Sequence, residues 1–195
     1  MLAIAIAKGE HYIAHKPKLL TYEDYARLTP PDSGNYELHN GKIGFMPTPI
    51  PKHQIISGNL FGLLFLHLRS HKIGRVIAAP MDTVFTPNDT LQPDILFISN
   101  KQLSIIGKVK IDGAPDFIVE ILSRSNSAKE MNYKKKVYET SGVREYWVIH
   151  PKKGVLTQYE NVKNQFVLKN TFSLEGIVTS FVVDGFSLKV GDLFI

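Results

Sequence analysis

The sequence predicts a mixed α/β fold (α+β), in which a central mixed β-sheet is flanked by helices and accompanied by additional β-hairpins. Apolar residues recur at helical spacing over residues 53–71, which predicts a long core helix closed by Gly74. A second, polar helix is expected over residues 127–141, and short runs rich in β-branched and aromatic residues lie around the two helices. An order of helix, strands, helix and strand is typical of mixed α/β domains.

The segment before the long helix predicts a capped helix followed by a hairpin. Thr21 and Asp24 resemble a capping box, which predicts a short helix that ends at the two prolines 30 and 31. Asn40-Gly41 is the strongest short-range signal for a tight β-hairpin, and it lies between the strand-like runs 36–39 and 42–46. This assignment places Glu37 on a strand.

The rest of the chain predicts the strands of the sheet. Strand-like runs, separated by Pro, Asn and Asp, cover residues 75–79, 82–86, 94–98, 117–122 and 145–149. The runs 155–159 and 165–168 flank the polar stretch 160–164 and predict a further hairpin, which is followed by a short closing segment to Ile195.

Length and composition favour one domain. The 195 residues, of which 44% are hydrophobic and 21% charged, are enough to bury one substantial core. We therefore expect an N-terminal extension over residues 1–20 and a single domain over residues 21–195. The chain contains no cysteine, which excludes disulfides, thiolate catalysis and Cys-based zinc sites and fits a reducing compartment.

Two apolar stretches, residues 1–7 and 60–68, are long enough to be compared with targeting or membrane segments. Residues 1–7 lack a basic region before them and a small-residue cleavage site after them, so we expect no signal peptide. Residues 60–68 are interrupted by Gly62 and His67 and are too short to span a bilayer. The sequence therefore predicts a soluble, cytoplasmic protein without a membrane partner.

The charge favours an anionic partner. A formal net charge of +5 and a pI near 9.3 are typical of nucleic-acid-binding proteins, although unrelated basic proteins share such values. The histidines show no HExxH spacing, and neither a Ser/His/Asp order nor a Gly-rich phosphate loop is present.

Glu120 is the most informative charged residue. It stands within the run 117–122, which is apolar on both strand faces, as expected for a central strand covered on both sides. An unpaired carboxylate there would be costly or would take up a proton, so we expect a metal ion or a buried lysine beside it. A structural salt bridge is the alternative.

The cluster at residues 134–136 offers one inward-facing lysine. At about 100° per residue, Lys134 projects into the middle of the apolar stripe formed by Met131, Val137 and Tyr138, whereas Lys135 lies at its edge. The alternative is a solvated helix face, in which Lys134 would pair with the residue four positions earlier.

Asp94 opens another strand-like run. It follows Pro93 and precedes the apolar residues 95–98, so its carboxylate stands at the mouth of a buried strand. Taken alone, a Pro-Asp pair at this place is more typical of a turn than of a binding site.

Several segments form an ordered set of motifs. They are Gln92-Pro93-Asp94, Gly113 to Ser123, Lys134 to Tyr138, and Gly142 to Trp147. Together they resemble the bacterial "putative restriction endonuclease" family, formerly a domain of unknown function, within the PD-(D/E)XK nuclease superfamily. The likeness runs from about Tyr22 to the C-terminus and includes residues 36–38 and 51–54.

The resemblance implies a restriction-endonuclease-like core and a set of site residues. Asp94 and Glu120 would be metal ligands, and Glu37 an additional acidic residue of the catalytic site. The superfamily usually has a lysine two residues after the second acid, where this chain has Leu122. In this family the lysine has moved to the following helix, which matches Lys134.

The resemblance also implies an activity. A Mg²⁺ ion, or Mn²⁺ in its place, would be bound by Asp94, Glu120 and the carbonyl of Ile121, and would serve hydrolysis of DNA phosphodiester bonds. Lys134 would orient the nucleophile or stabilise the transition state. Lys52, His53 and Lys135 are candidate nucleic-acid contacts, although His53 at the start of the long helix is equally able to cap or pack. Cleavage of both strands of a palindrome favours a homodimer.

Two alternatives stay open at this point. The first alternative to a nuclease is a catalytically weak or inactive nucleic-acid-binding module of the same fold. The second is an interaction protein without a nucleic-acid partner, in which Glu120 and Lys134 form a structural core pair. Salt-dependent DNA binding without cleavage would favour the first alternative. Tolerance of Glu120→Gln together with Lys134→Met, and no metal binding, would favour the second.

Overall fold

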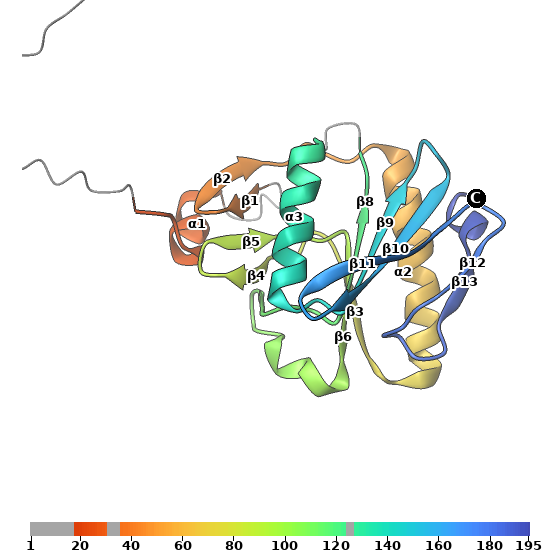
Figure 1. Cartoon of the computed structure of the whole chain (residues 1–195). Helices are drawn as coiled ribbons and strands as arrows, with labels where there is room; N and C mark the ends of the chain where they lie inside the picture. The colour runs from red at the N-terminus through yellow and green to blue at the C-terminus, as the bar shows by residue number, and fades with distance from the viewer. Residues whose placement is uncertain (1–17, 31–35, 124–126) are drawn as a thin grey trace, which may run out of the picture.

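The computed structural model describes residues 18–30, 36–123 and 127–195, and its fold is the expected mixed α/β type (Figure 1). The central six-stranded sheet has the order β11-β10-β9-β8-β6-β3. Its strands, in chain order, are β3 (Gly74–Ala78), β6 (Ile95–Ser99), β8 (Phe117–Ile121), β9 (Glu145–His150), β10 (Val155–Val162) and β11 (Gln165–Phe172). Only the β8–β9 pairing of this described sheet is parallel, so the sheet is mixed.

Two helices cover the two faces of the central sheet (Figure 1). Helix α2 (Pro51–His71) packs Ile56, Leu60 and Leu64 into one apolar cluster, and helix α3 (Ala128–Ser141) contributes Val137 and Tyr138 to the other. Each fully buried side chain of this size stabilises the fold by about 1.5–3 kcal/mol. The apolar run on both faces of β8 is thus explained, because its alternate side chains enter the two clusters.

A second sheet lies beside the first and supplies one of the acidic residues. Its strand order is β2-β1-β5-β4-β7, with β1 (Tyr36–His39), β2 (Lys42–Phe45), β4 (Thr83–Thr86), β5 (Asp89–Leu91) and β7 (Ile111–Asp112). The expected hairpin joins β1 to β2, and Asn40 and Gly41 at its turn have φ values of 47° and 70°. Positive φ at both turn residues is the conformation that Asn-Gly favours. Helix α1 (Tyr22–Leu28) begins with the expected capping box at Thr21.

The remaining elements are short, and the sequence patterns missed them. They are β12 (Ile177–Thr179), which pairs with β13 (Ser187–Lys189), and the 3₁₀ helices η1 (Asn100–Ile105) and η2 (Val190–Leu193). Strands of two or three residues, including β5 and β7, are too short to show a period of two. The predicted closing segment is therefore a small hairpin followed by η2.

Two sequence expectations concern the ends and the membrane. Most of the expected N-terminal extension, residues 1–17, lies outside the described residues. Among the helices that the structure describes, none is long and apolar enough to cross a membrane.

Candidate active site

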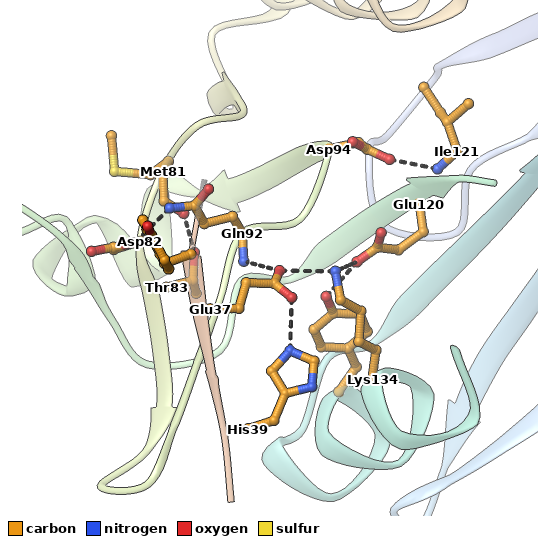
Figure 2. Close-up of polar contacts among 12 residues, drawn as sticks. Glu37, His39, Met81, Asp82, Thr83, Gln92, Asp94, Glu120, Ile121 and Lys134 are labelled. Carbon is orange, nitrogen blue, oxygen red and sulfur yellow. Dashed lines mark hydrogen bonds and ion pairs between the residues drawn. The ribbon is translucent and has the colours of Figure 1, made fainter. Parts of the chain in front are cut away.

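Lys134 joins two carboxylates that come from different sheets (Figure 2). Its Nζ lies 2.9 Å from Oε1 of Glu37 on β1 and 3.3 Å from Oε1 of Glu120 on β8. All three side chains are buried, and the lysine enters from α3. The inward direction predicted from helical spacing is therefore confirmed, and these three predicted site residues lie in direct contact.

Glu37 is held as an ion. His39 Nε2 lies 2.7 Å from its Oε2, and the backbone N–H of Gln92 donates to Oε1 at 2.8 Å. Burial alone would raise the pKa of Glu37, but the Lys134 ammonium and these hydrogen bonds outweigh it and lower the pKa to about 2. Glu37 is thus a permanent anion that keeps the ammonium of Lys134 in place.

Three polar residues that the sequence did not predict, His39, Tyr133 and Asp89, form a chain of contacts that begins at Glu37. The ring of His39 stacks on Tyr133 with centroids 5.2 Å apart, and the Tyr133 hydroxyl donates to Asp89. A sequence signal for His39 exists, because it lies two positions after Glu37 on the same strand and therefore projects to the same face. Tyr133 and Asp89 carry no comparable signal.

Glu120 has the opposite electrostatic character. The Tyr138 hydroxyl donates to its Oε1 at 2.5 Å, the same oxygen that Lys134 contacts. Burial raises the pKa of Glu120, Lys134 opposes the rise, and the charges of Asp94 and Glu37 add to it, so the pKa reaches about 7.

Lys134 is protonated in this cluster. Burial would lower its pKa, but the neighbouring carboxylates of Glu120 and Glu37 outweigh burial and raise it. The lysine therefore remains a cation at neutral pH and has donors directed at the acids.

Asp94 stands immediately before β6, beside the end of β8 (Figure 2). Its Oδ2 accepts the backbone N–H of Ile121 at 2.6 Å and lies 3.2 Å from Nε2 of His53. The last register pair between β6 and β8 is Ile95 with Val119. Just beyond it, the Asp94 carboxylate accepts the N–H of Ile121 in place of a backbone carbonyl of β6. The turn-like Pro93-Asp94 pair thus places its carboxylate against the central strand.

His53 contacts the site and is also buried. It lies in the first turn of α2, and its polar contacts are the Asp94 carboxylate and the backbone of Ile121. Burial would lower the pKa of His53, but the hydrogen bond and charge of Asp94 raise it. His53 therefore positions the Asp94 carboxylate.

The two lysines expected to contact nucleic acid lie outside the acidic cluster. Lys52 Nζ is 5.8 Å from the centroid of the Phe194 ring, and Lys135 Nζ is 3.7 Å from the centroid of the Tyr159 ring. Both lysines line a cavity of about 690 Å³.

The donor set fits a hard divalent cation. Asp94 and Glu120 offer carboxylate oxygens, and the Ile121 carbonyl points to the same side as its N–H, which is the side of Asp94. Across residues 18–30, 36–123 and 127–195, no three Asp, Glu or His side chains form a ready metal-binding group. Two carboxylates and a backbone oxygen, with water completing the shell, are nevertheless a donor set typical of Mg²⁺.

Comparison with known proteins decides the family. Residues 22–191 match the model of the family described as "Putative restriction endonuclease", Uma2. The chain belongs to this family. The resemblance predicted from the ordered motifs is therefore confirmed, and Uma2 membership supports a nuclease, an enzyme that hydrolyses phosphodiester bonds.

A solved structure supports the same fold. The chain is similar to the crystal structure titled "a putative nuclease belonging to DUF820" from Anabaena variabilis, with 21% sequence identity and a TM-score of 0.75. The similarity covers 90% of this chain and 97% of that chain, and it shows that the two proteins share their fold. No curated protein matches the chain significantly.

Proposed function

We propose that this Uma2 chain is a Mg²⁺-dependent endonuclease that hydrolyses DNA phosphodiester bonds. The observation that carries the proposal is the arrangement of Lys134 between Glu37 and Glu120, with Asp94 beside the same strand. Mn²⁺ is expected to replace Mg²⁺, because carboxylate and carbonyl oxygens suit both ions.

Each residue has a separate task in this proposal. Asp94, Glu120 and the Ile121 carbonyl would hold the cation. A cation held there would supply a coordinated water of lowered pKa and would neutralise charge on the phosphate. Lys134 donates hydrogen bonds to the attacking water or to a phosphate oxygen, where negative charge develops in the transition state. Glu37 keeps Lys134 charged and oriented.

DNA is the proposed substrate, and a homodimer the proposed assembly. The net charge of +5 favours a polyanion, and Lys52 and Lys135 are available near the site for phosphate contacts. A two-fold dimer would present one such site to each strand of a duplex.

The charge balance supports a functional site over a purely structural ion pair. A structural pair needs one lysine and one carboxylate, whereas here Lys134 serves two carboxylates and a third, Asp94, acts on the pKa of Glu120. An excess of buried negative charge raises the pKa of one acid and favours binding of a cation.

The proposal is tested with Asp94→Asn and, as a control that removes the same charge elsewhere, Asp184→Asn at an exposed position. Calorimetric titration with Mg²⁺ should show binding to the wild type and the control, and none to Asp94→Asn. Cleavage of plasmid DNA should require Mg²⁺ or Mn²⁺, stop with EDTA, and disappear in Asp94→Asn only.

Three outcomes would overturn the proposal. Cleavage that survives in Asp94→Asn contradicts the assignment of the site, and absence of site-specific Mg²⁺ binding contradicts the metal. Salt-dependent DNA binding without cleavage in either metal would replace the nuclease by a binding module.

A further inference from the structure

The cavity beside the acidic cluster has an aromatic wall and a basic rim. It measures about 690 Å³, and its walls come from β9, β10 and α3 and from the residues that follow β8. The side chains that matter most for its chemistry are Leu122, Met131, Lys135, Tyr146, His150 and Tyr159. A volume of this size is typical of small-ligand sites.

Strand register places the cavity directly beside Glu120. In the parallel pair of β8 and β9, Glu120 is the register partner of Val148, which lines the cavity, and Ile118 is the partner of Tyr146. Paired residues project to the same face of a sheet. The cavity therefore begins one strand away from the Glu120 carboxylate.

Helix α3 borders both the cavity and the acids. Residues 128, 131, 132 and 135 line the cavity and share one side of the helix at helical spacing, whereas Lys134 reaches the acids. Lys135 extends over the Tyr159 ring, so a cation stands at the cavity edge. A strand whose phosphate lies at the acids would thus have its neighbouring nucleotide at the cavity.

Two residues that line the cavity each carry a buried polar atom without a described partner. Tyr146 is 1% exposed, and within the part of the chain that the structure describes neither its hydroxyl nor Nδ1 of His150 has a hydrogen-bond partner. Buried polar groups are normally satisfied, so these two atoms point to a polar ligand. The rings of Tyr146 and Tyr159 stack at 5.9 Å and 23°, and Tyr159, the more exposed of the two, forms the aromatic wall of the cavity.

We propose that this cavity binds one unpaired nucleobase of the substrate strand, next to the phosphate that is cleaved. The inference rests on the proposed nuclease function and specifies its substrate. The Tyr159 ring would stack with a base, and the Tyr146 hydroxyl and His150 Nδ1 would supply hydrogen bonds to its polar edge. A base inside a duplex cannot present these surfaces, so the preferred DNA is single-stranded or carries an extrahelical nucleotide.

Binding is tested on the full chain in EDTA, with a short single-stranded oligonucleotide that carries one 2-aminopurine. The fluorescence of this base should be quenched in the complex with the wild type. Tyr159→Leu, which removes the aromatic wall, should weaken binding about tenfold. Tyr146→Phe removes only the unpartnered hydroxyl, so it retains the fold and should weaken binding about threefold. Tyr22→Leu and Tyr22→Phe on α1 are the matched controls and should bind as the wild type.

The same strand with an abasic site in place of 2-aminopurine should bind the wild type about tenfold more weakly. Equal affinity of the wild type, Tyr159→Leu and Tyr146→Phe for the base-containing strand, together with no loss for the abasic strand, would overturn the proposal.

The two proposals fail in different ways. Base-dependent binding in EDTA without any cleavage in Mg²⁺ would overturn the nuclease function and leave the base site standing. Metal-dependent cleavage that is equally fast in Tyr159→Leu, and that prefers an intact duplex over a bulged one, would overturn the base site and leave the nuclease standing.

Discussion

Two glutamates on adjacent strands are both buried, but their carboxylates have different kinds of neighbours. Glu120 on β8 is 5% exposed and shares its Oε1 with an ammonium and a hydroxyl. Glu145 on β9 is fully buried, and the donors to its carboxylate that the structure describes are all neutral. Those donors are the Trp147 and Gln158 side chains at Oε1, and the Ser180 hydroxyl and the backbone N–H groups of Phe181 and Val182 at Oε2.

The difference separates a structural acid from the acid that we propose to act in catalysis. Burial raises the pKa of both glutamates. Donors of the chain itself surround both oxygens of Glu145, which ties the segment at residues 180–182 to the sheet. Glu120 instead lies among Glu37, Asp94 and Lys134, so its charge depends on that of its neighbours. Burial alone therefore does not indicate a functional acid, whereas a cluster of interacting charges is more typical of functional sites.

The largest expected effect is on catalysis. Glu120→Gln should reduce the rate of metal-dependent DNA cleavage about 10²–10³-fold, because the amide cannot replace an anionic ligand at the site of charge development. Glu145→Gln should leave the rate per folded molecule unchanged. Initial rates at saturating Mg²⁺, normalised by circular dichroism, measure both. Equal losses of rate in the two variants would show that Glu120 and Glu145 do not differ in function.

The next effect is on stability. Glu145→Ala should lower the free energy of unfolding by about 3 kcal/mol, because it leaves several buried donors without an acceptor. Urea unfolding of the metal-free protein measures it, with the exposed Asp184→Ala as the control. A midpoint equal to that of the control would mean that Glu145 does not anchor the segment at residues 180–182.

The third effect is a dependence on pH. The pKa of Glu120 is raised from 4.5 to about 7 in the fold, so between these values the folded chain binds more protons than the unfolded chain. The contribution of Glu120 to stability is therefore lost as pH rises from 4.5 to 7. The pKa of Glu37 is lowered to about 2, so its contribution is lost as pH falls below 4.5.

Urea unfolding of the metal-free wild type and Glu120→Gln across pH 5–8 checks the sign, since only the wild type should lose the Glu120 contribution. Mg²⁺ requires the ionised acid, so its affinity should fall as pH drops below about 7. A Mg²⁺ affinity independent of pH in this range would contradict the role of Glu120 as a ligand.

The smallest effect compares two buried tyrosines. Tyr138→Phe removes the hydrogen bond to Glu120 and should cost about 1 kcal/mol of stability. Tyr146→Phe removes a hydroxyl without a described partner and should cost nothing in the free protein. Thermal unfolding of both variants is the measurement, and equal destabilisation would show that Tyr146 is satisfied in the free chain.

The sequence predicted the local part of this arrangement. Helical spacing gave the direction of Lys134, the apolar run around Glu120 indicated a buried charge, and Asn40-Gly41 indicated the hairpin that carries Glu37. The functional roles of these residues stay predictions. The family resemblance placed Glu37 among the site residues, but its ion pair with Lys134 was not predicted, because it joins two sheets that no local pattern relates.

The missed features depend on contacts between distant segments. Glu145 opens the largely apolar run 145–149 and is buried like Glu120, but a glutamate at the start of a strand is more typical of an exposed position. Its donors include residues 180–182, in a segment without a clear pattern. The cavity was missed for the same reason, since its walls come from several strands and helices.

The leucine at position 122 has a consequence for how this protein can diversify. It stands two residues after Glu120, so a lysine there would extend from the same face into the cavity that Leu122 now lines. Because the lysine is on α3 instead, Lys134 contacts the acids and Leu122 is left to line the cavity. Substitutions at Leu122, Met131 or Val148 can therefore reshape what the cavity accepts during evolution, while the charges that are proposed to cut the strand remain as they are.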